Sequence, residues 1–181
     1  MSKIAFKEWQ VVCEALRIGK QSIILRKGGI AEGKQGFEFK HSLFSLYPTL
    51  FHQQHELTNW NDGKALEGHD KQDVSIQTVC KVIHACVLTD WEKVLALSPY
   101  HIWKEEVIHE RFEYNNARAI HLALVRSYNL NRPIQLNYDK SYGGCKSWIE
   151  LKEDPCQQDS TPAVDDHNFD TLHRDLKNIY E

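Results

Sequence analysis

The sequence predicts an α+β domain around a mostly antiparallel sheet that could curl into a barrel, with short flanking helices. Apolar or alternating runs of strand length recur at residues 22–27, 74–88, 119–127, 134–138 and 145–151. The helical stretches between them are short and do not alternate with strands as βαβ units do. With 181 residues, the chain is long enough to bury a sizeable core as one domain.

The N-terminal stretch 6–18 predicts a helix. Trp9, Cys13 and Leu16 follow one another at helical spacing and would form one apolar face. Gly19 follows directly, and a glycine at this position is typical of a helix end. The chain then enters the apolar strand 22–27, so a helix and a strand are expected to be joined by a short turn.

A glycine-rich turn is expected at the end of strand 22–27. The strand closes with Arg26-Lys27, and the next two residues are Gly28-Gly29. Paired glycines adopt positive φ without steric cost, which allows a tight turn or the close approach of a ligand to the backbone. Two cations beside free backbone N–H groups would suit an anion such as a phosphate. The alternative is a solvated strand end, which is the commonest role of such charges.

A second strand is predicted after the turn. Phe37 and Phe39 alternate with charged residues, so they would share one face of it. The apolar signal continues to Tyr47, and the segment Tyr47-Pro48-Thr49 should end the strand because proline has no N–H for the ladder. Seven residues of the predicted strands are expected in the core: Ile24, Leu25, Phe39, Val79, Val82, Leu122 and Leu124.

The later part of the chain predicts two helices and a separate tail. Asp90 is placed to cap a short helix over 90–97, and the first part of 100–113 is also helical in pattern. Residues 1–152 would then form the α+β domain. Residues 153–168 are rich in acids and proline and predict a linker, and residues 169–181 have the apolar spacing of an amphipathic helix that could bind a protein partner.

Composition excludes some classes of protein. The net charge is −3, but residues 1–50 hold 8 Lys and Arg against 4 Asp and Glu, so a basic N-terminal part sits on an acidic protein. No apolar run approaches the length that spans a bilayer, and the start lacks a signal-peptide core, so we expect no membrane contact. Five cysteines at irregular spacing predict reduced thiols, a cytoplasmic location and no disulfide framework. No cofactor or metal is indicated.

Two enzymatic hypotheses remain open beside binding. Glu38-Phe39-Lys40 matches half of a metal-dependent nuclease site, in which acids hold the metal ion and lysine stabilises charge. Cys145 follows a Gly-Gly pair whose N–H groups could stabilise an oxyanion, although no Cys/His signature accompanies it. Catalysis is therefore less favoured than binding.

Several separated blocks resemble one protein family. They are Lys7-Glu8-Trp9, Leu25–Ile30, Leu46–Thr49 with His52-Gln53, Arg111-Phe112, Leu124–Arg126 and Tyr142–Trp148. In this order they resemble a bacterial, largely cyanobacterial family catalogued as domain of unknown function 1802, over roughly residues 5–151. The resemblance implies a shared surface but no known activity.

The predicted barrel-like sheet is also similar to PUA-like modules, which bind RNA or modified DNA. The favoured hypothesis is therefore a nucleic-acid-binding module, with phosphate contacts from basic residues and base stacking on aromatic residues. An accessory subunit of a larger assembly is the alternative. The expected ligand-binding residues are Arg26, Lys27, Gly28, Gly29, Lys40, Tyr47, His52, Gln53, Arg126 and Trp148.

Overall fold

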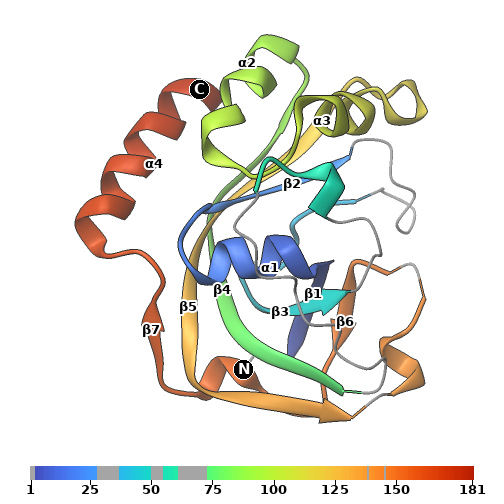
Figure 1. Ribbon diagram of the computed structural model, residues 1–181, viewed down its shortest axis with the longest axis vertical. Helices are drawn as coiled ribbons and strands as arrows, with labels where there is room; N and C mark the ends of the chain where they lie inside the picture. Colours follow the sequence, from blue (N-terminus) through green and yellow to red (C-terminus); the bar gives the residue numbers. More distant parts are fainter. Residues whose placement is uncertain (1–2, 28–36, 50–54, 61–72, 138, 145) are drawn as a thin grey trace.

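The computed structural model describes residues 3–27, 37–49, 55–60, 73–137, 139–144 and 146–181. Their fold is a strongly curved, open sheet of seven strands with four short α-helices around it (Figure 1). The strands are β1 (Ile4–Trp9), β2 (Ile23–Lys27), β3 (Leu43–Thr49), β4 (Asp73–Leu88), β5 (Ile120–Asn137), β6 (Trp148–Glu150) and β7 (Ser160–Pro162). This confirms the predicted α+β class.

The order of the strands is β2-β5-β4-β3-β1-β6, and β7 adds to β5. All pairs are antiparallel except β1 with β3. The two longest strands, β4 and β5, run beside each other and bend along their length (Figure 1). Their register shifts between Ile76 and Thr78 and again between Val82 and His84, and such irregularities increase local twist. The sheet therefore curls without closing.

The N-terminal segment differs from the predicted single helix. Residues Ile4–Trp9 form β1, an inner strand between β3 and β6, and only then does α1 (Gln10–Arg17) begin. The helical spacing from Cys13 to Leu16 is real, but tertiary pairing with β3 holds the preceding residues extended. Gly19 has a φ of +73°, as expected for a glycine directly after a helix.

Three further helices cover the sheet. α2 (Trp91–Ala96) begins after Asp90, whose side chain accepts a hydrogen bond from the Glu92 backbone N–H, as the sequence predicts. α3 (Glu105–Phe112) follows near it, and α4 (Asp166–Tyr180) comes after β7 and lies beside α2 (Figure 1). Of the seven residues expected in the core, Phe39 and Val82 are partly buried, and the other five are buried.

The C-terminal part is integrated with the sheet rather than joined by a linker. Within residues 153–168, Pro155–Gln157 form a 3₁₀ turn and β7 pairs with β5. The helix begins at Asp166, earlier than predicted, because Asp165 caps it through the Asn168 backbone N–H. Phe169 and Leu176 are buried in the main core. The low apolar content of the segment indicated a linker, but a few well-placed contacts hold it.

Candidate functional site

A pocket of about 410 Å³ lies where β1 and β2 end beside α3. It is large enough for one small molecule or one nucleotide, since ligand pockets start at roughly 300 Å³. The described residues that line it are aromatic, aliphatic and basic, and one carries a carboxylate. The lining residues are Trp9, Arg26, Lys27, Leu57, Val107, Glu110, Arg111 and Tyr114.

One face of α3 supplies much of the wall. Val107, Glu110 and Arg111 are spaced i, i+3 and i+4, which puts them on one side of a helix. Val107 is buried in the core, which fixes the rotation of the helix. The same rotation turns Glu110 and Arg111 towards the pocket.

Arg111 is held rigidly at the base of the pocket. Its guanidinium carbon lies 3.8 Å from the centroid of the Trp103 ring and 5.4 Å from that of Trp9. Its Nη1 donates a hydrogen bond to the Leu25 carbonyl at 3.1 Å. Burial lowers the pKa of Arg111 to about 10; Glu8 raises it and Arg26 lowers it further. The side chain thus stays charged at neutral pH, in a fixed orientation.

Arg26 links the two ends of the open sheet. From edge strand β2, its Nη2 donates to the Lys7 carbonyl of β1 at 3.0 Å and to Ser147 Oγ, next to edge strand β6, at 3.1 Å. Its Nη1 lies 3.9 Å from Glu8 Oε1, and its guanidinium packs over the Phe6 ring. With 19% of its side chain exposed, Arg26 has a packing role as well as a charge.

Lys27 differs from its neighbour because it lies at the rim. Its Nζ is 3.6 Å from the centroid of the Tyr114 ring, a cation–π contact. Tyr114 is 38% exposed, so both groups reach solvent at the mouth of the pocket. The pair presents a charge and an aromatic ring side by side.

Positive charge exceeds negative charge among the described residues of the pocket. Three cations line the pocket, against the carboxylate of Glu110. The buried Glu8 beneath them offsets one more charge, and it also accepts a hydrogen bond from the Trp9 backbone N–H at 2.8 Å. A partly buried excess of positive charge is costly unless an anion joins it, so the arrangement favours an anionic ligand.

The other residues expected at the site lie in different places or outside the described residues. Gly28, Gly29, His52 and Gln53 are outside the described residues, as is Cys145. Lys40 lines a separate pocket of about 380 Å³ with His41, Asp154, Cys156 and others. Tyr47 is 8% exposed and packs against Tyr142.

Trp148 belongs to the aromatic core near Arg26. Its ring centroid lies 4.7 Å from that of Phe6 and 5.2 Å from that of Phe44. Its indole N–H donates to the Glu38 carbonyl at 3.3 Å. Trp148 therefore supports the wall behind Arg26 and does not line the pocket.

Arg126 is far from this pocket. In the β2–β5 register Arg26 pairs with His121, so Arg126 lies five residues further along β5, roughly 17 Å away, with its side chain on the opposite face. There it forms an ion pair with Asp166 at the start of α4 and packs over the Phe169 ring. Arg126 is thus bound to the C-terminal helix.

Four residues important for the pocket were missed from the sequence: Glu8, Trp9, Trp103 and Arg111. Glu8, Trp9 and Arg111 lie in the blocks that resemble the family, and Trp103 shares the amphipathic stretch 100–113 with Arg111. These were the available signals, but core helices carry the same amphipathic pattern. Only the fold brings Arg111 to the carbonyl of Leu25, 86 residues earlier.

The described residues offer little for metal chemistry. No group of three or more His, Cys, Asp or Glu side chains that could hold a metal ion occurs among them. Glu38 is exposed, and its backbone carbonyl is bound to Trp148. In addition, no helix within the described ranges is long and apolar enough to cross a membrane.

Comparison with solved structures defines the class of fold. An ASCH domain from Zymomonas mobilis superimposes with a TM-score of 0.51 at 14% identity, covering 85% of this chain and 90% of that chain. A point mutant of the same Zymomonas mobilis protein matches with a TM-score of 0.47 at 13% identity, covering 85% and 91%. The likeness to the first of these structures shows a shared fold: the chain has the PUA-like fold of ASCH domains, as the sequence predicted.

The chain belongs to the family described as Domain of unknown function (DUF1802), which matches residues 5–175. The match confirms the family indicated by the sequence blocks and extends beyond residue 151 into α4. This agrees with the packing of α4 against the sheet. No curated protein matches the chain.

Proposed function

We propose that this protein binds nucleic acid through the pocket between β1, β2 and α3. One observation carries the proposal: three cations and two aromatic side chains line the pocket, against one lining carboxylate in the described structure. Phosphate groups supply the missing negative charge, and bases supply flat faces for the aromatic rings. The PUA-like fold is consistent with this role, but fold alone does not assign a function.

Residues at the base and at the rim of the pocket have different roles in this proposal. Arg111 is immobilised on Trp103, so little side-chain entropy is lost when its guanidinium meets a phosphate. Lys27 at the rim contacts the phosphate backbone of the nucleic acid. Trp9 or Tyr114 stacks on a base, a contact worth on the order of 1–3 kcal/mol.

A single strand suits the pocket better than a duplex. Bases paired and stacked inside a duplex cannot enter a pocket of about 410 Å³, whereas an unpaired nucleotide can. We therefore expect binding to single-stranded oligonucleotides to be tighter than binding to blunt duplexes.

The test is a titration of labelled single-stranded and duplex RNA and DNA at several salt concentrations, followed by fluorescence anisotropy. Lys27→Ala should weaken binding and reduce the salt slope by about one unit, because one phosphate contact is lost. Lys81→Ala is the matched control, since Lys81 is exposed on β4 and does not line the pocket. Absence of any binding at tens of micromolar protein at low salt would refute the proposal.

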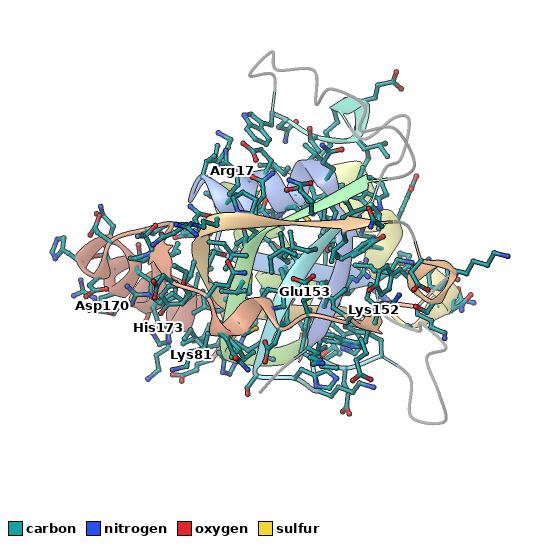
Figure 2. All side chains as sticks on the ribbon, turned by 90° about the horizontal axis from the view of Figure 1, so that it is seen from below. Arg17, Lys81, Lys152, Glu153, Asp170 and His173 are labelled. Carbon is teal, nitrogen blue, oxygen red and sulfur yellow. The ribbon has the colours of Figure 1, made fainter. Side chains whose placement is uncertain are left out.

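The alternative role as an accessory subunit has less support. Its basis was the amphipathic helix at the C-terminus, but Phe169 and Leu176 of α4 pack into the protein's own core. In Figure 2, α4 lies at one side of the molecule and carries Asp170 and His173, which are polar. The apolar face of this helix is already occupied.

A further inference from the structure

Glu110 is the carboxylate of the pocket wall, and its position is unusual. It lies on the same side of α3 as Val107 and Arg111, among three cations. The neighbouring acid Glu113 pairs with Arg118, but the carboxylate of Glu110 forms no ion pair with any described residue. It is therefore available to a ligand.

Glu110 differs from the other described lining residues in its hydrogen-bonding capacity. Arginine, lysine and the tryptophan indole are donors only, and Leu57 and Val107 offer neither donors nor acceptors. The Tyr114 hydroxyl can do both. Among the described lining side chains, Glu110 is thus the one charged acceptor, and it can receive two hydrogen bonds from one ligand edge.

The bases differ in what they present to such an acceptor. Guanine carries a ring N–H and an exocyclic amino group side by side on its Watson–Crick edge, which match the two oxygens of a carboxylate. Cytosine and adenine offer one amino group each, and carboxylates accept hydrogen bonds from the cytosine amino group in known complexes. Uracil has no amino group and places carbonyl oxygens on both sides of its N–H, which a carboxylate repels.

We infer that Glu110 is a specificity residue that selects nucleotides whose base carries an amino group, guanine above all. The inference rests on the proposed nucleic-acid-binding function of the same pocket. The phosphate lies towards Lys27 and Arg111, and the base enters with its Watson–Crick edge towards Glu110. The ligand is therefore an unpaired nucleotide, because pairing would hide that edge.

The experiment measures the affinity of the protein for each of the four ribonucleoside 5′-monophosphates. Each nucleotide is titrated separately, at low salt, into the full chain labelled with ¹⁵N and followed by NMR. The indole N–H signals of Trp9 and Trp103 report on the pocket, since both rings contact Arg111. Wild-type protein should bind GMP at least about fivefold more tightly than UMP, the lower end of the discrimination of one two-point base contact. CMP and AMP should fall between them.

Glu110→Gln should reduce the preference for GMP over UMP to less than about twofold, because a neutral amide no longer attracts two donors. The same change removes a negative charge, which favours the phosphate of every nucleotide, whereas GMP alone loses a two-point contact. UMP should therefore gain affinity relative to GMP, and the ratio of the two affinities is the readout. Glu106→Gln on the same helix is the control and should keep the wild-type ratio, since Glu106 is exposed and does not line the pocket.

Three outcomes would overturn the inference, and they differ in what they say about the proposed function. Equal binding of the four nucleotides, still dependent on Lys27, leaves nucleic-acid binding in place and removes base selection by Glu110. A GMP preference that survives in Glu110→Gln assigns the selection to other residues. Failure of every nucleotide and oligonucleotide to bind removes both proposals together.

Discussion

Two regions of this molecule hold an arginine packed on an aromatic ring, and they differ in how its charge is balanced. At the C-terminal helix, Arg126 lies over Phe169 and forms an ion pair with Asp166. At the pocket, Arg26 and Arg111 lie over Phe6 and Trp103, with Glu8 as the buried acid between them. The helix region is balanced one to one, and the pocket region is not.

The difference separates structure from function. Asp166 is 87% exposed, so its pair with Arg126 fastens α4 without a large desolvation cost. Glu8 is 1% exposed and offsets only part of the charge around it. An excess of positive charge that the described residues do not neutralise leaves a role for a ligand, and this is why the pocket, rather than α4, is the candidate site.

The largest effect is expected from the aromatic residue that anchors α4. Phe169→Ala should lower the free energy of unfolding by about 3–5 kcal/mol, because Phe169 is 3% exposed and lies in the main core. Urea denaturation measures this. Oligonucleotide affinity of the folded variant should match wild type. A loss below about 1 kcal/mol would show that α4 docks weakly and that the tail behaves as the predicted linker.

Removing the acid beneath the pocket should also be costly. Glu8→Gln leaves Arg26 and Arg111 without their buried counter-charge, which typically costs about 3 kcal/mol. Asp166→Asn, the matching change in the other region, should cost less than about 1 kcal/mol because that pair is exposed on one side. Equal losses in the two variants would contradict the difference between the regions. Added polyanion should stabilise Glu8→Gln more than wild type.

The pocket region should also be sensitive to acid through His101. Burial, and then the charge of Arg111, lowers the pKa of His101 to about 4 from its usual 6.5, so the folded state holds it neutral. Between these values the unfolded chain binds a proton that the folded chain does not, and stability falls as pH drops from about 6.5 towards 4. The contribution lost is on the order of 3 kcal/mol.

The control for this pH dependence is His101→Asn. The Nδ1 atom of His101 accepts a hydrogen bond from the Trp103 backbone N–H at 3.1 Å, and the asparagine carbonyl can replace that acceptor without titrating. Thermal melts across pH 4 to 7 should show a shallower slope for the variant than for wild type. Identical slopes would mean that other groups cause the acid sensitivity.

The sequence predicted most of the sheet because its signals are local. The apolar triplet Ile23-Ile24-Leu25 and the alternation in β4 report burial directly. β1 was assigned to a helix because its extended state depends on β3, some 40 residues later, and pairing between distant segments leaves no local trace. The same limit applies to α4, whose docking depends on two buried side chains.

The candidate site was predictable only in part for a similar reason. Arg26 and Lys27 stood out because glycines follow them. Arg126 was grouped with them by charge, yet the register of β5 places it on the opposite face. Arg111 reaches the pocket through packing on Trp103, and nothing in the sequence near either residue shows that they meet. Convergence of distant residues is a property of the fold.

The smallest effect on stability is expected from the tyrosine at the pocket rim. Tyr114 is 38% exposed and contacts Lys27, so Tyr114→Ala should lower the free energy of unfolding by less than about 1 kcal/mol. If its ring stacks on a base, affinity for a single-stranded oligonucleotide should nevertheless fall by about 1–3 kcal/mol. The corresponding tyrosine of the other region is Tyr128, whose ring lies 5.9 Å from the guanidinium of Arg126. Tyr128→Ala should leave affinity unchanged, because that cation already has its partner in Asp166. Equal affinity losses in both variants would mean that binding follows global stability, and would contradict the assignment of the pocket as the nucleic-acid interface.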